Sequence, residues 1–246
     1  MLKYPISTLL WLTKQSIKDK IQDILKIHNN IDIKVEVKVI DKDGKIIKIH
    51  KQKSHSFLMN FLAMIGGLMV NPYGSENNYY YFLATTGTWW SYSPNYTTVQ
   101  NTLTILDSAN DSTYGIVVGT GTATPTPMDY KLGNQIVNGT STEQLVYGAH
   151  SVSPAPATGG ISGATTQPST GVLTPSGNTT SFQISRTFQN QSGASITVSE
   201  VGIIAYVMLN GDNQEYVLII HDLLSSAITI PNNGVMAITY TISVTT

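Results

Sequence analysis

The stretch AITYTISVTT, residues 237–246, alternates apolar and hydroxylated side chains with a period of two. Such alternation is typical of a β-strand that buries one face and exposes the other. The segments SITVSEVGIIAYVML (195–209) and EYVLIIHDLL (215–224) are also strand-like, and Asn210-Gly211 between them predicts a turn. Residues 181–246 are therefore predicted to form an antiparallel β-module.

Residues 1–72 predict a smaller α/β part, expected to act as an assembly segment. In residues 31–50, IDIKVEVKVIDKDGKIIKIH, apolar and charged side chains alternate, and Asp43-Gly44 closes two strands into a hairpin. Residues 15–28 have apolar side chains at the spacing of an amphipathic helix. Residues 57–70 predict an apolar helix that is too short to span a bilayer. This helix is expected to pack against its own core, another subunit or lipid.

Two further regions lie between these parts. Residues 73–149 form an aromatic-rich β region, whereas residues 150–180 are dominated by proline, glycine, serine and threonine. The second composition is typical of a long loop or extended arm with little core of its own, able to wrap a neighbouring subunit. The whole chain is thus predicted to be mainly β, with a small α/β N-terminal part and an antiparallel β-sandwich or barrel-like body.

Charge is sparse and unevenly distributed. Only 12% of the 246 residues are charged and there is no cysteine, which excludes thiol chemistry and cysteine-based zinc sites. Twelve of the 14 cationic residues but only six of the 15 acidic residues lie within residues 1–53, which gives formal charges of +6 there and −7 in the remainder. The basic part is either a solvated surface or a contact surface for an acidic protein or nucleic acid. The residues predicted for such a surface are Lys34, Lys38, Lys45, Lys48, Lys51 and Lys53.

An aromatic cluster follows the apolar helix in the sequence. Rings that alternate with small hydroxylated residues can stack on sugars or can anchor a subunit interface. No accompanying group of Asp, Asn and Arg is present to bind sugar hydroxyls, so both interpretations remain open. The residues predicted for glycan or subunit contact are Tyr79, Tyr80, Tyr81, Trp89, Trp90, Tyr92 and Tyr96.

The segment YGIVVGTGTATPTPMDYKL, residues 114–132, superficially resembles a strand that enters a phosphate-binding loop. A phosphate loop requires a helix directly after its glycines, because the anion binds unpaired N–H groups at the helix start. Pro125 and Pro127 follow here instead and favour an extended chain. We therefore expect Gly119-Thr120-Gly121 to form a turn between strands, with one glycine at positive φ.

No motif supports catalysis. The chain contains no zinc-protease, nucleophile-elbow or calcium-loop pattern, so no catalytic residue, cofactor or metal site is predicted and the protein is not expected to be an enzyme. His221-Asp222 is expected to be a hydrogen-bonded structural pair, and Glu200 is expected to pair with Arg186. The remaining acid and base candidates are Asp129 and His150.

Three stretches together resemble structural proteins of tailed phages and archaeal viruses. They are GIVVGTGTATPTPMDYKL (115–132), FQNQSGASITVSEVGIIAY (188–206) and LIIHDLLSSAITIPNNGVMAITYTI (218–242). SHSFLMNFLAMIGGLM (54–69), after a lysine-rich hairpin, is similar to the start of such chains. Because these motifs specify turns and cores, the resemblance implies a scaffold rather than a reaction.

The resemblance implies a virion component, of the tail, neck or nozzle type, that forms a homo-oligomer and contacts other virion proteins. Under this interpretation the basic N-terminal part meets viral DNA or an acidic protein surface, and host glycan is a further partner. The alternative is a host-surface glycan-binding adhesin or a receptor-binding spike component, which would use the aromatic cluster.

Overall fold

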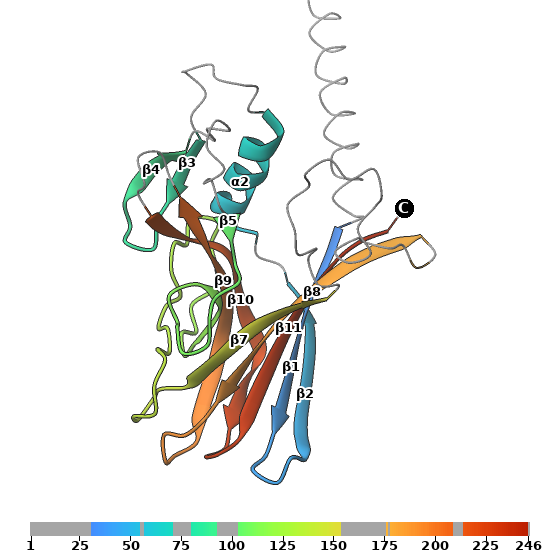
Figure 1. The fold of residues 1–246 in the computed structure, drawn as a ribbon, viewed down its shortest axis with the longest axis vertical. Helices are drawn as coiled ribbons and strands as arrows, with labels where there is room; N and C mark the ends of the chain where they lie inside the picture. The colour runs from blue at the N-terminus through green and yellow to red at the C-terminus, as the bar shows by residue number, and fades with distance from the viewer. Residues whose placement is uncertain are drawn as a thin grey trace, which may run out of the picture.

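The structure, a computed structural model, describes residues 31–54, 57–70, 80–92, 103–153, 176, 178–208 and 214–245. The predicted helix 15–28, Tyr79, Tyr96 and residues 154–175 of the predicted arm lie outside the described residues. Antiparallel sheets dominate the described part, and the predicted mainly-β class with a small helical part is confirmed. Figure 1 shows two groups of long strands leaning together, with β9 and β10 on one side and β1, β2 and β11 on the other.

The larger sheet has five strands and joins the two ends of the described chain. Its order is β2 (Ile46–Lys53), β1 (Ile31–Ile40), β11 (Val235–Thr245), β8 (Thr179–Gln189) and β7 (Val146–Ser153), and every neighbouring pair is antiparallel. The predicted 43–44 turn is confirmed: Gly44 adopts a φ of +80°, and Asp41 Oδ1 accepts the N–H groups of Asp43 and Lys45.

The second sheet is built on two long strands, β9 (Ile196–Met208) and β10 (Gln214–Ile230). On the edge of β9 opposite β10, β6 (Gly115–Gly119) pairs with residues 200–204 and β5 (Leu103–Thr104) with residues 206–207. A separate hairpin consists of β3 (Tyr80–Leu83) and β4 (Trp89–Tyr92).

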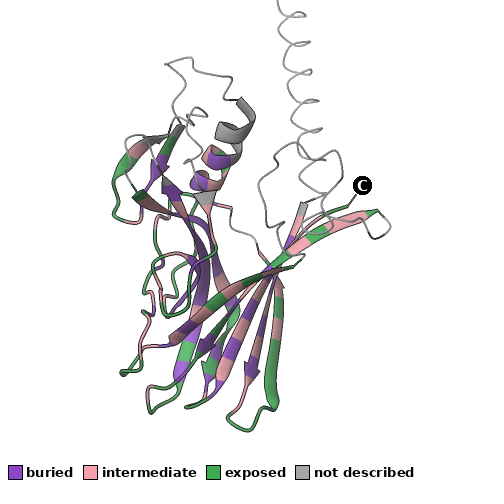
Figure 2. Ribbon diagram, viewed as in Figure 1, coloured by how far each residue is buried: buried purple, intermediate pink, exposed green. Residues whose placement is uncertain are grey.

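One hydrophobic core lies between the two sheets. Valines of β1 that alternate with charged residues point inward, as the sequence predicts, and Val35, Val37 and Val39 are fully buried. They share a cluster with Val198 of β9 and Ile228 of β10. Figure 2 shows that buried residues follow the facing strands, whereas β2 is largely exposed. The basic hairpin, the 73–149 region and the 181–246 module therefore contribute to one core.

The apolar helix begins later than predicted. Helix α2 spans Met59–Val70, and the two preceding residues belong to the neighbouring sheet. Phe57 forms a bridge with Ile220, and the N–H of Leu58 donates to the carbonyl of Ile219 (3.2 Å). Because these two residues pair with the free edge of β10, the helix begins only after them. Within the described residues, no helix has the length and apolar character needed to cross a membrane.

Asn60 attaches α2 to the body of the protein. Its side chain is 2% exposed and makes three hydrogen bonds: Nδ2 donates to the carbonyls of Leu83 and Leu218, and Oδ1 accepts the N–H of Leu83. The described first half of the helix thus packs against its own fold, since Leu58 and Met64 are also buried. Leu62 is 59% exposed and lies on the outside.

Candidate functional site

The Gly119-Thr120-Gly121 loop does hold an anion, and that anion is a side chain of the same chain. The carboxylate of Glu200 accepts hydrogen bonds from the N–H groups of Gly121 (2.9 Å), Gly133 (3.0 Å) and Asn134 (2.8 Å). Convergent backbone N–H groups are also what phosphate-binding loops offer to their ligand. The likeness to a phosphate loop therefore has a physical basis, with the carboxylate in the ligand's place.

The glycines of this loop leave room for the carboxylate of Glu200. A Cβ on Gly119 would lie 2.3 Å from Glu200 Oε1, and a Cβ on Gly121 would lie 2.5 Å from the same atom. Neither glycine has a positive φ, so the expectation of a left-handed glycine here is wrong. The close approach of the Glu200 carboxylate to the backbone is what excludes a side chain at both positions.

His221 on β10 lies between two carboxylates. Its Nε2–H donates to Glu200 Oε2 (2.9 Å) and its Nδ1–H donates to Asp129 Oδ2 (2.7 Å). Burial disfavours the charged imidazolium, but the hydrogen bonds and charges of Glu200 and Asp129 outweigh it and raise the pKa of His221. Burial likewise opposes the charge of Glu200, yet the bond from His221 and the three backbone N–H groups lower its pKa to about 2. The raised pKa of His221 and the lowered pKa of Glu200 both favour an imidazolium between two carboxylates.

This group is a structural joint. Each oxygen of Glu200 accepts two hydrogen bonds, and the Glu200 and His221 residues are only 1% and 3% exposed. A general acid or base must reach a reacting atom with a free proton or lone pair, which Glu200 lacks. Among the described residues, no group of three or more His, Asp or Glu side chains is suited to hold a metal ion. The joint instead fixes the 119–134 loop onto β9 and β10.

The predicted His221–Asp222 hydrogen-bonded pair and the predicted Glu200–Arg186 pair are both wrong. Glu200 bonds to His221 and not to Arg186, and Asp222 accepts a hydrogen bond from the hydroxyl of Tyr240 (3.0 Å) instead of pairing with His221. Adjacent residues of a strand point to opposite faces of the sheet, so His221 and Asp222 meet different surroundings.

Arg186 is a second internal joint. Its side chain is fully buried, and its five N–H donors reach five backbone carbonyls. Asp107 Oδ2 lies 3.7 Å away, and the ring of Tyr147 lies 4.7 Å from the guanidinium carbon. The guanidinium thereby ties a loop before β6 to strand β8. The carbonyls belong to Ser108, Asp111, Tyr114, Ile116 and Gly148.

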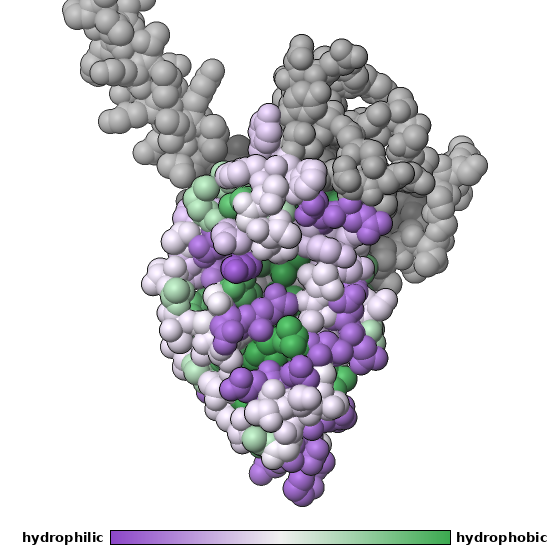
Figure 3. Space-filling model, turned by 90° about the vertical axis from the view of Figure 1, so that its left-hand side faces the viewer, coloured by the Kyte–Doolittle hydropathy of each residue, from purple (hydrophilic) through white to green (hydrophobic). Residues whose placement is uncertain are grey.

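In the folded protein, several acidic residues of the β-body lie inside these joints and not at the surface. Of the acidic residues beyond residue 53, Asp107, Glu200 and Asp222 are buried, and Asp129 is bonded to His221. The described acidic side chains that remain at the surface of this part are Asp111, Glu143 and Glu215. Within the described part of the chain, the exterior of the β-body therefore carries few charged side chains. On the face shown in Figure 3, apolar surface is confined to small patches between polar side chains.

The predicted basic surface is present but is partly neutralised. Lys34 and Lys53 pair with Asp32 at 2.8 and 3.5 Å, and Lys38 and Lys51 pair with Glu36 at 2.7 and 2.6 Å. All four lysines stay exposed, with two carboxylates for four ammonium groups. Of the other two predicted lysines, Lys48 lies on the opposite face and donates to the carbonyl of Ala227 (3.3 Å), and Lys45 is exposed near the hairpin turn.

The predicted aromatic cluster is divided between the inside and the outside. Tyr81 and Trp89 are 56% and 47% exposed and lie on one face of the β3–β4 hairpin. Trp90 faces the other way and packs against the core, and its buried Nε1 has no hydrogen-bond partner among the described residues. Tyr80 and Tyr92 belong to β3 and β4, and their side chains are not described. Two of the seven predicted residues are thus shown to be available for contact.

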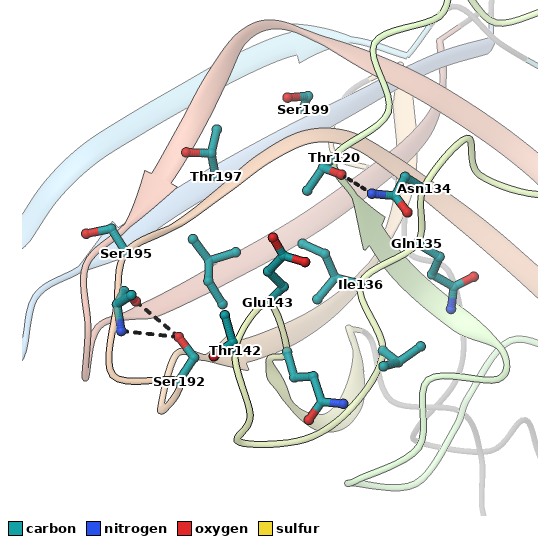
Figure 4. A pocket seen from close by; sticks show the side chains of 14 residues that line it. Thr120, Asn134, Gln135, Ile136, Thr142, Glu143, Ser192, Ser195, Thr197 and Ser199 are labelled. Carbon is teal, nitrogen blue, oxygen red and sulfur yellow. Dashed lines mark hydrogen bonds between the residues drawn. The ribbon is translucent and has the colours of Figure 1, made fainter.

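A groove that the sequence did not indicate lies beside the Glu200 joint. It has a volume of about 730 Å³ and runs between the first residues of β9, the turn that precedes them and the 134–144 loop (Figure 4). Hydroxyl and amide side chains dominate its lining, and Glu143 is its one ionisable group. The polar lining residues are Thr120, Asn134, Gln135, Thr142, Glu143, Gln144, Ser192, Ser195, Thr197 and Ser199.

No family model, curated protein or solved structure matches this chain.

Proposed function

We propose that this chain is a structural protein of a virus particle, of the tail, neck or nozzle type, and that it acts by forming an oligomer. The observation that carries the proposal is strand β2. It lies at the edge of the five-stranded sheet, and among the described residues it pairs only with β1. Ile46, Ile47 and Ile49 on this strand are 50%, 48% and 52% exposed. An apolar edge strand favours pairing with another chain.

The lysines of the hairpin favour a partner of particular charge. Lys45, Lys48 and Lys51 are interspersed with the exposed isoleucines, so two β2 edges brought together would repel one another. An acidic strand or surface of another subunit or virion protein would be attracted, and viral DNA offers the same sign of charge. The internal joints support a scaffold role, since the ionisable groups of the core hold loops to sheets.

Native mass spectrometry of the full chain tests the proposal. We expect a defined oligomer that is weakened by Ile47→Glu combined with Ile49→Glu, because the change adds charge to the exposed edge. Leu62→Glu combined with Met128→Glu is the matched control, since it places the same charge on two exposed apolar residues outside β2. A stable monomer at high concentration, or an oligomer indifferent to the β2 variant, would contradict the proposal.

A glycan-binding adhesin or receptor-binding spike component is the second candidate function. It is favoured by Tyr81 and Trp89, which expose two aromatic rings on one face of a hairpin. A glycan array probed with the full chain and with Trp89→Ala tests it, with Met128→Ala as a control at another exposed apolar residue. Binding that is absent, or that survives Trp89→Ala unchanged, would remove this candidate.

A further inference from the structure

The groove beside Glu200 lies along an unpaired edge of strand β9. On one side, β10 accompanies β9 from Ile196, which pairs with Ile230, to Met208. On the other side, β6 covers residues 200–204 and β5 covers residues 206–207. Among the described residues, no strand pairs with residues 196–199 on that second side. The first four residues of β9 therefore present an open sheet edge.

The groove has the position and width of a missing strand. Beyond β6, the chain at Gln135 bridges to Gly119, and the N–H of Ile136 donates to the carbonyl of Val118 (2.9 Å). The order across the sheet is thus β10, β9, β6 and then residues 135–136. Where β6 stops, its position between β9 and the 134–144 loop is vacant, as Figure 4 shows at the end of the green strand. Two strand spacings leave roughly 10 Å between the walls.

The Glu200 joint explains why β6 stops. Glu200 lies opposite Gly119 in register, and its carboxylate takes the N–H of Gly121, while the N–H of Thr120 donates to the carbonyl of Asn134 (2.9 Å). The first bond takes the chain out of line with the β9 edge towards the Glu200 side chain, and the second joins it to residue 134, so after Gly119 the chain no longer continues the ladder with the β9 backbone. The vacant strand position therefore results from the buried Glu200–His221 pair and from the loop after Gly119 that this pair holds.

The groove walls keep hydrogen-bonding groups available. Among the described residues, the side chains of Thr142, Glu143, Ser195 and Ser199 make no hydrogen bond or ion pair, and Glu143 has a φ of +63°. The backbone of the far wall is used within its own turn, where the N–H of Leu145 donates to the carbonyl of Val137 (3.3 Å). A ligand would thus bond the β9 backbone and the polar side chains. The single carboxylate disfavours an acidic ligand.

We propose that this groove accepts an extended segment as an added strand on β9, and that the segment is residues 157–167 of a neighbouring copy. The inference rests on the proposed oligomer. Residues 157–167, ATGGISGATTQ, contain no charge and no proline, so every residue can supply an N–H to a sheet edge. Their small and hydroxylated side chains match the hydroxyl and amide groups that dominate the groove lining.

Chain length favours a neighbouring copy over the same copy. Residues 154–175 leave β7 at Ser153 and return before β8, whereas the groove lies near the opposite end of these strands, where Val146 pairs with Gln189. The eight residues of β7 span about 26 Å. A round trip within one copy would use about 52 Å of the roughly 70 Å that 22 extended residues can span. The roughly 18 Å that remains is about half of the ~36 Å that the 11 residues 157–167 span when extended, so one copy cannot place the whole segment in its own groove.

Disulfide trapping in the full chain tests the proposal, because the chain has no cysteine and each introduced thiol is unique. Ser199→Cys places a thiol in the groove, and Ser162→Cys or Gly163→Cys places one on either face of the added strand. Mixing a groove variant with an arm variant under mild oxidation is expected to give the mixed disulfide. Docking raises the effective thiol concentration, so formation should be at least about tenfold faster than with the control pair. The control replaces Ser199→Cys with Ser181→Cys, an exposed position on β8.

Two outcomes would overturn the proposal. One is a mixed disulfide that forms no faster than in the control pair. The other is a Ser162→Cys, Ser199→Cys double variant whose disulfide closes within one chain. A synthetic 157–167 peptide in excess should slow the mixed disulfide, whereas a scrambled peptide of equal composition should not. Native mass recorded in parallel separates the two proposals, since an intact oligomer without the disulfide contradicts only the groove, and a monomer contradicts both.

Discussion

Charged side chains perform opposite tasks in two regions of this molecule. On the outer face of the β1–β2 hairpin, four lysines surround Asp32 and Glu36, and the lysine side chains are 45% to 69% exposed. Inside the body, Arg186 and the Glu200–His221 pair have side chains that are at most 4% exposed. Exposed pairs contribute little to stability because water and salt screen them, whereas a buried charge that loses its partner destabilises strongly.

The difference teaches that the number of charges in a segment does not indicate how strongly those charges affect the stability of the fold. The hairpin holds most of the lysines of the chain, yet few of its pairs should affect folding. The β-body has two cationic residues beyond residue 53, and one of them, Arg186, organises five carbonyls. Five measurements test this contrast.

Arg186→Met should have the largest effect. It removes five N–H donors from buried or part-buried carbonyls and leaves Asp107 without its cation, so we expect the free energy of unfolding to fall by about 4 kcal/mol. Denaturant unfolding measures it. Arg186→Lys keeps the charge but has three donors, so its free energy of unfolding should lie between those of the unaltered protein and Arg186→Met. A loss below about 1 kcal/mol for Arg186→Met would refute the role of Arg186 as a joint.

Glu200→Gln should cost about 3 kcal/mol of unfolding free energy, because the new amide group would face the N–H groups of Gly133 and His221. The pKa of His221 should fall at the same time, which NMR titration of its imidazole can follow. Glu36→Gln applies the same chemical change to the exposed hairpin and should cost well under 1 kcal/mol. Equal losses of unfolding free energy for the two variants would mean that burial does not explain the different roles of charge in the two regions.

Gly121→Ala should lower the free energy of unfolding by about 2 kcal/mol, because its Cβ would lie 2.5 Å from Glu200 Oε1. Gly133→Ala is the matched control: it borders the same carboxylate, but its Cβ would meet the nearest atom at 3.5 Å, an ordinary contact. Thermal unfolding of both variants measures the difference. If Gly133→Ala is as harmful as Gly121→Ala, close approach to Glu200 is the wrong explanation for the glycines.

Acid should weaken the body through His150. Its Nε2 accepts the N–H of Ile116 and its Nδ1–H donates to the carbonyl of Asp107, and burial together with the Arg186 charge lowers its pKa to about 4. A lowered histidine pKa gives stability that is complete above pH ~6.5 and is lost as pH falls towards the folded pKa.

The loss should reach about 1–2 kcal/mol once partial access of water is allowed for. His221 has the opposite sign, because its raised pKa gives stability that is complete below pH ~6.5 and is lost as pH rises through the folded pKa. NMR titration should find His150 neutral and His221 charged at pH 6. Unfolding curves of His150→Asn should lose the decline between pH 6.5 and 4, and an unchanged decline would assign it to another group.

Lys51→Ala should have the smallest effect, below about 0.5 kcal/mol, although Lys51 lies only 2.6 Å from Glu36. Unfolding at low and at physiological salt measures it, and salt should reduce the effect further. A loss above about 1 kcal/mol would show that the hairpin pairs act as a network and would weaken the contrast with the interior.

Alternation along the strands was enough to predict the β class, the inward valines of β1 and the 43–44 turn, because each depends on neighbours in sequence. The start of α2 could not be predicted, since Phe57 and Leu58 are captured by β10 from far along the chain. The same holds for the candidate site. Glu200 is bonded by groups from three distant segments, at Gly121, at Gly133 and Asn134, and at His221.

One sequence signal did point to the joint. Residues 196, 198 and 200 share the inward face of β9, so Glu200 is an ionisable residue at a core position and must have internal partners. Its partners follow only from knowing that β6 lies beside β9. The groove left no signal, because a vacant strand position results from where β6 ends and not from any residue type.

The pairing of β1 with β11 also governs when the protein can fold. The Ser243 hydroxyl donates to the carbonyl of Asp32 across 211 residues of sequence, so the largest sheet closes through contacts of very high sequence separation. Such topologies fold slowly, because loop-closure entropy opposes each distant contact. On the ribosome, the valine face of β1 must wait until β11 has been synthesised. During that interval, we expect the lysines of the hairpin to oppose aggregation of the nascent apolar strand, because like charges repel.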